Sequence, residues 1–500
     1  MAWEKSMDPA DPMYGFIMSG VQDGFHITDC SKITTNVEVD NYNSATARTN
    51  RSKVEAQIQY EIQNFRYVPV RYKPQIISAL GAVPKSSDSV RLIHDCSRPC
   101  GHSLNDFNVH DPFQYQSLQD AVDHIKPGYY LAKLDLESAY RSVRIHPSNY
   151  AATGLKWTFS GDKEPTYLID TRLPFGARAS PGIFHQLGQA VRRMLARKRI
   201  YNVIVYLDDF LIIAETKELC NYYLRETIHL LRYLGFSINY NKVIGASQVM
   251  TFLGIELNTV NMTLSLPEDK LKTLKLSLMD LVSRKKVSKK ALQSLAGKLN
   301  WACQCIYGGR IYMRRILDAI RTLTNPWHRT RITQALREDI WWWINYLSVF
   351  NGYTEMVESR PITPVCIDAC PVAAGAVHSD QFVYTPWSWW PGSDPHHINF
   401  KETLALEPAV AFWGPSWRNK KVYVRCDNQA AVGIINKGTC RNEFVMQSLR
   451  RVFWYSVFYN FRLKAMYIPG KYNQMADAIS RMHEYFTMPC IPSNLDTNNV

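Results

Sequence analysis

The sequence predicts a multidomain protein in which an α+β unit, a helical section and a C-terminal α/β unit follow one another. Three observations support this fold class. The chain has 500 residues, which is too long for one hydrophobic core and suggests about three domains. Residues 202–214 place two adjacent aspartates between apolar runs rich in β-branched residues, as in paired core strands. Beyond residue 362, short strands that end in acidic residues alternate with helical patterns.

The composition is that of a basic globular protein. Apolar residues make up 46% of the chain, which is ample for packed cores. The net charge is +14, and the basic residues occur in short clusters, such as residues 197–199 and 284–286. One such cluster is typical of a solvated helix face, but their sum favours a polyanionic partner. The eleven cysteines include no CxxC pair, which indicates reduced thiols and no zinc site.

The two ends of the chain are expected to be peripheral. Residues 1–55 are polar, without sustained periodicity, and are predicted to form a loosely ordered N-terminal arm; residues 486–500 are predicted to be a tail. No signal-peptide pattern and no run of about 18 apolar residues is present. We therefore expect a soluble protein of the cytoplasm or the nucleus that has no membrane partner.

The first structured unit is predicted over residues 56–258. Its first motif is a β-hairpin that carries Lys85 and Arg91 on its two arms, close to the polar turn. An ordinary surface hairpin explains this pattern, and a site that holds a triphosphate is the alternative. A later loop, rich in glycine and proline, contains Phe175 and Gly176 and leads into a helix. Such a loop can bring the backbone close to a ligand.

Three aspartates of this unit follow or separate apolar strands. Asp135 ends a buried-strand pattern, and Asp208 and Asp209 lie between two further strands. A tight turn explains an isolated Asp pair. A platform for a hard divalent cation is the other interpretation, because carboxylates are seldom buried without a partner. The third carboxylate, Asp135, favours the cation.

The rest of the chain divides into a helical section and a second acid-bearing unit. Residues 259–358 are amphipathic and basic, with a leucine stripe that belongs to the core and basic faces that are candidates for nucleic-acid contact. Residues 359–364 are a plausible linker to a domain over residues 359–485. That domain carries four acids in the order strand end, helix, strand end, helix: Asp368, Glu402, Asp427 and Asp477.

The motif around Asp208 resembles the palm of reverse transcriptases. The sequence Tyr206-Leu-Asp-Asp209, with Asp135 upstream and Leu173-Pro-Phe-Gly176 between them, matches that family in order and approximate spacing. The resemblance implies a right-hand polymerase with fingers and palm over residues 56–258 and a thumb or connection over residues 259–358. It also implies phosphoryl transfer with two Mg²⁺ or Mn²⁺ ions that lie roughly 3.5–4 Å from one another. The three aspartates would hold both ions.

The resemblance further implies which residues bind the incoming nucleotide. Lys85 and Arg91 match fingers residues that hold the triphosphate, and Phe175 and Gly176 match the loop behind the nucleotide. Tyr140 lies where the family places the aromatic ring that blocks a ribose 2′-hydroxyl. Deoxynucleoside triphosphates are therefore the expected substrates.

The four later acids resemble the two-metal site of an RNase H domain, which follows the polymerase in this family. Asp368, Glu402, Asp427 and Asp477 would hold Mg²⁺ or Mn²⁺ for hydrolysis of one strand. Many such enzymes carry a histidine in the loop before the last acid, and residues 470–473 contain none. We expect metal-dependent cleavage with an altered rate or altered product release.

Together the two sites predict an RNA-directed DNA polymerase with RNase H activity that copies the RNA of a retroelement into DNA. DNA synthesis on RNA leaves a hybrid that must be removed, so the expected partners are an RNA template, a DNA primer and the RNA–DNA hybrid. Residues 91–106, 266–270 and 397–402 resemble the DIRS class of retrotransposons, which implies a separately encoded tyrosine recombinase and a Gag-like protein. The alternatives are a domesticated, non-catalytic nucleic-acid-binding protein and a pararetrovirus-type polymerase.

Overall fold

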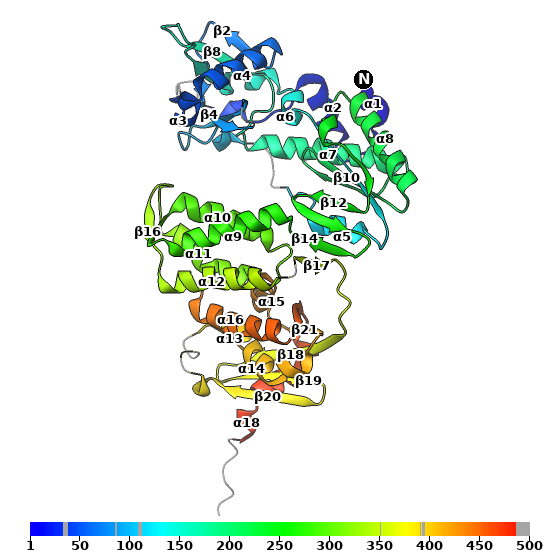
Figure 1. Ribbon diagram of the computed structural model, residues 1–500, viewed down its shortest axis with the longest axis vertical. Coiled ribbons are helices and arrows are strands. Elements are labelled where there is room, and N and C mark those ends of the chain that lie inside the picture. The colour runs from blue at the N-terminus through cyan, green and yellow to red at the C-terminus, as the bar shows by residue number, and fades with distance from the viewer. Residues whose placement is uncertain are drawn as a thin grey trace, which may run out of the picture. The chain divides into compact units, whose positions relative to one another are not determined.

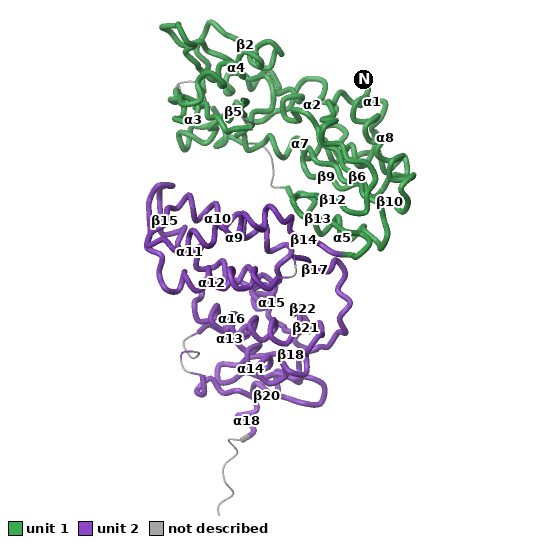
Figure 2. Tube along the Cα trace, in the orientation of Figure 1, with its two compact units in different colours: residues 1–262 green, residues 263–500 purple. Residues whose placement is uncertain are grey.

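A computed structural model of the protein describes residues 1–33, 39–85, 88–108, 113–350, 352–390, 392 and 396–486. The chain forms two compact units, Met1–Met262 and Thr263–Val500 (Figures 1 and 2). Their boundary lies close to the one predicted after residue 258. The boundary predicted after residue 358 does not separate compact units, and strand β18 (Ile362–Ala369) begins inside the proposed linker.

The prediction of a loosely ordered arm over residues 1–55 is wrong for the described residues. This segment forms helices α1 (Ala2–Ser6), α2 (Tyr14–Asp23) and α3 (Ala45–Thr49) and the start of α4 (Arg51–Gln63). Trp3 and Ile17 are buried in the main core of the first unit. The Trp3 indole donates a hydrogen bond of 3.1 Å to the carbonyl of Leu234. These helices are too short for a periodic pattern, and contacts distant in sequence stabilise them.

A four-stranded antiparallel sheet, with strand order β11-β6-β10-β9, carries the aspartates of the first unit. Its strands are β6 (Tyr130–Asp135), β9 (Val203–Tyr206), β10 (Asp209–Ala214) and β11 (Ile244–Ser247). Helices α7 (Ala179–Arg197) and α8 (Lys217–Tyr233) pack against it (Figure 1). Their long apolar faces and the central strands make up most of the core.

A second layer of the first unit holds the predicted hairpin. Strands β4 (Ala79–Pro84) and β5 (Val90–Asp95) pair antiparallel, as the sequence predicts, and α4 packs against them. A five-stranded sheet of order β1-β3-β7-β8-β2 lies in the same part of the unit. Its strands are β1 (Val39–Asp40), β2 (Tyr67–Val70), β3 (Ile76–Ile77), β7 (Gly154–Trp157) and β8 (Thr166–Asp170). The remaining elements are α5 (Leu118–His124), α6 (Ala139–Ser142), β12 (Val249–Phe252) and β13 (Ile255–Asn258).

The second unit begins with the predicted helical section. Its helices are α9 (Glu268–Ser283), α10 (Lys289–Ala302), α11 (Arg314–Arg321) and α12 (Gln334–Val349). Leu274, Leu278 and Leu281 of the predicted stripe are buried. Short strands accompany the helices: β14 (Thr263–Ser265) pairs with β17 (Tyr353–Glu355), and β15 (Lys286–Ser288) pairs with β16 (Arg329–Arg331).

The C-terminal part of this unit is an α/β layer structure around a five-stranded sheet of order β20-β19-β18-β21-β22. Strands β18, β21 (Lys421–Cys426) and β22 (Arg462–Tyr467) run parallel, whereas β19 (Ala373–His378) and β20 (Gln381–Pro386) are antiparallel additions at the other edge. The helices are α13 (Ile398–Leu404), α14 (Leu406–Trp413), α15 (Gln429–Lys437), α16 (Glu443–Phe458), α17 (Gln474–Ser480) and α18 (His483–Phe486).

Helix α17 lies so close to β19 that only glycine fits at residue 375. A Cβ atom on Gly375 would lie 2.4 Å from the backbone nitrogen of Ser480. This close approach brings the helix that carries Asp477 against the sheet that carries Asp368. Across the described ranges, all cysteines are free thiols, and no helix has both the length and the apolar character needed to span a bilayer.

Candidate functional site

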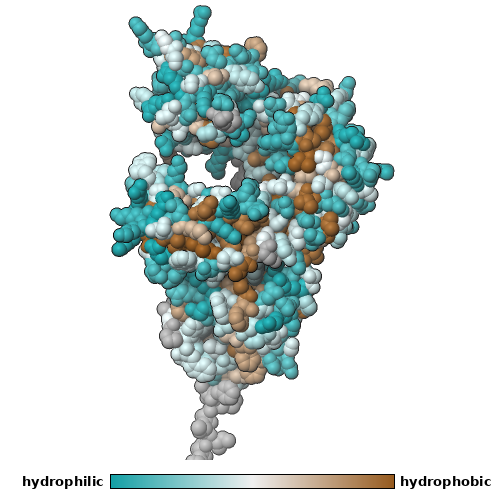
Figure 3. Space-filling view, in the orientation of Figure 1, coloured by the Kyte–Doolittle hydropathy of each residue, from teal (hydrophilic) through white to brown (hydrophobic). Residues whose placement is uncertain are grey.

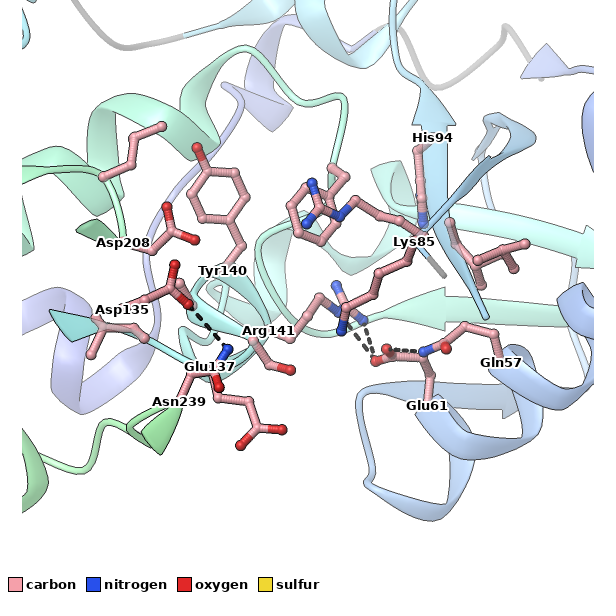
Figure 4. Close-up of a pocket in the computed structure, with 18 of the residues that line it drawn as sticks. Gln57, Glu61, Lys85, His94, Asp135, Glu137, Tyr140, Arg141, Asp208 and Asn239 are labelled. Carbon is pink, nitrogen blue, oxygen red and sulfur yellow. Dashed lines mark hydrogen bonds and ion pairs between the residues drawn. The ribbon is translucent and has the colours of Figure 1, made fainter. Parts of the chain in front are cut away.

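The fold brings Asp135 and Asp208 to one cavity of about 390 Å³ in the first unit (Figure 4). Asp135 ends β6 directly opposite Asp209, the first residue of β10. Asp208 lies in the turn before it, where Leu207 adopts a left-handed backbone with a φ of 55°. The amide of Leu136 donates to the carbonyl of Asp208 at 3.1 Å and locks the turn beside β6. The carboxylates of Asp135 and Asp208 face one another beside Tyr140 (Figure 4).

Burial of two neighbouring acids makes this site electrostatically unfavourable for negative charge. Burial raises the pKa of Asp208, and the nearby carboxylate of Asp135 raises it further. Burial also raises the pKa of Asp209, against the effect of Lys133, whose ammonium lies 3.8 Å from the Asp209 carboxylate. Asp209 does not line the cavity. The structure therefore brings the three predicted acids together, with Asp135 and Asp208 on the cavity and Asp209 beside them against a lysine.

Two polar residues that sequence reasoning missed contact Asp135. The Lys242 ammonium donates to one carboxylate oxygen at 2.9 Å, and the Asn239 amide donates to the other at 3.4 Å. The hydrogen bond to Asp135 raises the pKa of Lys242. Both residues belong to the short 3-10 turn of residues 239–242, more than 100 residues from Asp135. No pattern in the sequence marks such a turn as part of a site.

Four of the five residues predicted to bind a nucleotide line the same cavity: Lys85, Arg91, Tyr140 and Phe175. The Arg91 guanidinium lies 4.8 Å from the centroid of the Phe175 ring, and the centroids of the Tyr140 and Phe175 rings are 5.1 Å apart. Cation–π and aromatic contacts of this kind fix the orientation of the rings. The cavity therefore joins a basic wall and an aromatic wall to the acid pair.

Gly176 is the predicted residue that does not line this cavity. Its φ of 123° and its close approach to β5 require glycine, because a Cβ atom would lie 1.8 Å from the carbonyl oxygen of His94. The amide of His94 donates to the carbonyl of Phe175 at 2.7 Å. Gly176 thus acts by docking the loop on the hairpin, which sets the position of Phe175.

A buried ionic network lies behind the aromatic wall, and sequence reasoning missed it. Arg141 donates to Asp170 at 2.7 Å and to Glu61 at 3.0 Å and 3.1 Å. The Tyr67 hydroxyl and the His94 ring are 2.8 Å apart, and His94 lies 3.6 Å from Asp170. Burial lowers the pKa of Arg141, but its two carboxylate partners and Tyr67 outweigh this effect and raise it overall. The network ties α4, β2, β5 and β8 to the residue that follows Tyr140.

The second predicted acid set gathers at the sheet of the C-terminal α/β structure. Asp368 lies in β18, Glu402 on α13, Asp427 directly after β21 and Asp477 on α17. Glu402, Asp427 and the neighbouring thiol of Cys426 offer ligand atoms that all lie within 4.8 Å of one another. Cys426 was expected only as a buried thiol. Its position at the strand end beside Asp427 was visible in the sequence.

Burial and mutual repulsion raise the pKa values of two acids of this set. Burial, Asp368 and Asp427 raise the pKa of Glu402 to about 9. Burial, with further contributions from Asp427 and Asp477, raises the pKa of Asp368 to about 6, although the Ser480 hydroxyl donates to it at 2.7 Å. Oxygen donors that repel one another are the ligand set that a hard divalent cation stabilises. The residues present therefore fit Mg²⁺ or Mn²⁺.

Asn473 lies at the end of the loop in which a histidine is often expected, and Asp477 lies on the helix α17 that follows. The Asp477 carboxylate is half-exposed and accepts from Arg481 at 2.9 Å, so it is turned toward its own helix. Asn473 is buried and donates to the carbonyl of Ile367 at 3.0 Å and to Asp368 at 3.4 Å. Asp368 is therefore oriented by Ser480 and Asn473, and Asp477 lies at the edge of the set.

Comparison with known proteins relates part of the first unit to a described family. Residues 83–257 match the family described as "Reverse transcriptase (RNA-dependent DNA polymerase)". The genome polyprotein of Petunia vein clearing virus (isolate Shepherd) is 21% identical over 401 residues, which cover 76% of this chain and 17% of the polyprotein. The Transposon Tf2-3 polyprotein of Schizosaccharomyces pombe is 21% identical over 441 residues, which cover 84% of this chain and 30% of the polyprotein. The chain spans less than a third of the length of these relatives.

Solved structures share the fold over almost the whole chain. The foamy viral protease-reverse transcriptase in complex with RNA/DNA hybrid aligns with a TM-score of 0.54 at 14% identity and covers 99% of this chain and 64% of that one. The same viral protein in complex with dsDNA aligns with a TM-score of 0.53 at 15% identity and covers 97% and 96%. The predicted fold class, a right-hand polymerase followed by an RNase H-like α/β domain, is confirmed.

Proposed function

We propose that this protein is an RNA-directed DNA polymerase that copies retroelement RNA into DNA and degrades the RNA strand of the resulting hybrid. One observation carries the proposal: a single cavity joins Asp135 and Asp208 to the basic side chains of Lys85 and Arg91. Polymerisation needs cations beside the triphosphate and carboxylates beside the reacting oxygens. The match of residues 83–257 to the reverse transcriptase family supports the same chemistry.

Divalent cations fit both acid sets. Asp135, Asp208 and Asp209 would hold Mg²⁺ or Mn²⁺ at the polymerase site, and the four later acids would do so at the nuclease site, two ions at each. Such ions activate the attacking oxygen and stabilise the leaving oxygen. Asp209 would have to leave Lys133 to take part, and Lys242 would have to share Asp135 with the cation.

The residues of the cavity determine which nucleotide is accepted. Lys85 and Arg91 hold the triphosphate. The Lys85 ammonium acts as a compact point charge, and the planar Arg91 guanidinium can donate two parallel hydrogen bonds. The Phe175 ring, fixed by Arg91 and Tyr140, supports the nucleotide. The Tyr140 ring occupies the space that a ribose 2′-hydroxyl would need, so the site selects deoxynucleotides.

In the nuclease site, Ser480 and Asn473 fix Asp368, and Glu402 and Asp427 face it. Asp477 joins the set only when its carboxylate turns from Arg481. Without a loop histidine, release of the cleaved strand would depend on this side chain. We expect hybrid cleavage that is slower than synthesis.

The biological setting is also part of the proposal. Residues 91–106, 266–270 and 397–402 resemble the DIRS class, in which a separately encoded tyrosine recombinase and a Gag-like protein complete the element. The expected partners of this chain are RNA template, DNA primer, RNA–DNA hybrid and deoxynucleoside triphosphates.

The test is primer extension on an RNA template with Mg²⁺, with the primer and the RNA carrying different labels. Extension of the primer together with shortening of the RNA is the expected result. Extension without shortening would remove the nuclease from the proposal. Tight binding of the hybrid with neither activity, and with no uptake of Mn²⁺ in calorimetry, would favour a domesticated binding protein. Asp208→Asn and Asp427→Asn serve as matched controls, because each removes one carboxylate from one site.

A further inference from the structure

A short ribbon in the second unit exposes an unusual concentration of positive charge. Strands β15 and β16 pair so that Lys286 lies opposite Arg331 and Ser288 lies opposite Arg329. Like charges directly opposite one another weaken a strand pair. Val287, on the other face, is buried and anchors the ribbon to the helices, while Lys286, Arg329 and Arg331 are exposed. The strand pair is therefore stabilised by the buried Val287 on one face and exposes its cations to solvent.

The ribbon cations have no acidic partner within the described ranges. None of Lys286, Arg329 and Arg331 forms an ion pair there. Two acids on the adjoining helices are already engaged: Asp280 pairs with Arg284 at 2.7 Å, and Glu338 pairs with Arg315 at 3.1 Å. In Figures 1 and 2 the ribbon lies at the left edge of the second unit, where Figure 3 shows a projecting hydrophilic surface. This concentrated positive charge is complementary to a polyanion.

An exposed tryptophan lies next to these cations on a rigid turn. The side chain of Trp327 is 72% exposed, two residues before Arg329. The Lys289 ammonium donates to the carbonyls of Leu323 and Thr324 at 2.7 Å and 3.0 Å. The amide of Lys289 donates to the carbonyl of His328 at 2.9 Å.

The His328 ring closes the same turn. It lies 3.0 Å from the Thr324 hydroxyl and 3.2 Å from the Asn325 amide. These contacts hold the backbone on both sides of Trp327, so a large indole is presented to solvent by a fixed scaffold. Exposed aromatic rings among arginines are the combination that binds unpaired bases and their phosphates.

We propose that this surface, formed by Lys286, Arg329, Arg331 and Trp327 and here called the ribbon site, binds a single-stranded nucleic-acid segment. The three cations contact backbone phosphates, and one unpaired base stacks on the indole. An acidic peptide would satisfy the cations but would leave the indole without a stacking partner. A duplex would satisfy the cations but has no unpaired base to offer. The inference deepens the proposed function, because an enzyme that copies RNA must hold an unpaired strand.

The test measures binding of the full chain to a labelled single-stranded RNA oligonucleotide without nucleotides or divalent ions. Salt is varied between about 50 and 200 mM, where phosphate contacts are most visible. The triple variant Lys286→Gln, Arg329→Gln, Arg331→Gln is expected to reduce the slope of log K against log salt by about 2, or about 0.7 for each lost contact. Lys217→Gln, Arg225→Gln, Arg232→Gln removes the same charge from the exposed face of α8 and is expected to leave the slope unchanged.

The stacking contact is tested by a second variant and its matched control. Trp327→Ala is expected to weaken binding about five-fold or more without changing the salt slope. Trp389→Ala, which removes an equally exposed indole (73%), is expected to have no such effect. The ribbon site would be overturned if the two triple variants had equal effects or if the two tryptophan variants had equal effects. It would also be overturned if a polyglutamate peptide bound more strongly than the RNA.

Failure of this inference is distinguishable from failure of the proposed function. Unchanged binding by the ribbon variants, with primer extension intact in the unaltered chain, overturns the ribbon site alone. Ribbon-dependent binding in a chain that extends no primer supports the ribbon site and overturns the polymerase.

Discussion

Replacing Arg141 with methionine tests whether the buried ionic network holds the nucleotide cavity together. Arg141 is the only cation in contact with Asp170 at less than 3 Å among the described residues, and it also binds Glu61 through two nitrogens. The Asp170 side chain is fully buried and that of Glu61 is 7% exposed. Loss of the guanidinium therefore leaves two carboxylates in the interior. Methionine keeps much of the side-chain volume and removes the charge.

The expected loss of stability in Arg141→Met depends on the partners that Asp170 and Glu61 retain. Breaking a buried ion pair from one side costs about 3–5 kcal/mol. Asp170 keeps His94 at 3.6 Å, and Glu61 keeps the Gln57 amide at 2.9 Å and the Arg66 guanidinium at 3.8 Å. These weaker partners place the expected loss at the lower end, about 3 kcal/mol. For a unit of this size that loss corresponds to a fall in Tm of roughly 6–12 °C.

Thermal and denaturant unfolding of the variant measure this loss directly. Arg225→Met, which removes an exposed arginine from α8, is the control and should change stability by less than about 0.5 kcal/mol. Adding Glu61→Gln to Arg141→Met should cost at least about 1 kcal/mol less than the sum of the two single changes. Stability of Arg141→Met within the control range, or strict additivity with Glu61→Gln, would refute the reasoning.

Four further outcomes are expected. Asp208→Asn should abolish DNA synthesis and leave hybrid cleavage intact, and loss of both activities would contradict two independent sites. Asp427→Asn should do the reverse in the same assay with two labels. Tyr140→Ala should admit ribonucleotides, and unchanged sugar discrimination in single-nucleotide incorporation would remove its assigned role. Because Glu402 carries a proton below about pH 9, cation binding must displace it. Calorimetric affinity for Mn²⁺ at the nuclease set should therefore rise between about pH 6 and pH 9, and a flat profile would count against this protonation state.

The positions of the acids at strand ends and strand turns were predictable, because a carboxylate there interrupts the apolar pattern of a buried strand. Asp135, Asp208 and Asp427 each interrupt or end a run of apolar, β-branched residues, where a carboxylate has no structural reason to be. The hairpin of β4 and β5 was predictable for the same kind of reason, since a polar turn separates two alternating strands. Local patterns of this kind carry the signal within a few residues.

The parts that were missed depend on contacts distant in sequence. Arg141 binds Glu61 across 80 residues, and Lys242 binds Asp135 across 107 residues. Each residue alone has the pattern of an ordinary exposed charge, and only the fold shows its partner. The N-terminal helices were missed because α1 has five residues and is stabilised by the burial of Trp3 against a helix end more than 200 residues away.

Two pairs of buried carboxylates in this protein contrast in the charges that surround them. Asp170 and Asp11 are buried against arginines, and the hydrogen bonds and charge of Arg193 lower the pKa of Asp11 despite its burial. Glu402 and Asp368 are equally buried, yet they face other acids, and their pKa values rise to about 9 and about 6. Keeping Glu402 ionised at pH 7 would cost about 3 kcal/mol, since each unit of pKa is worth about 1.4 kcal/mol. Asp170 and Asp11 have arginine partners, so an acid pair without one is best explained by a cation that binds there.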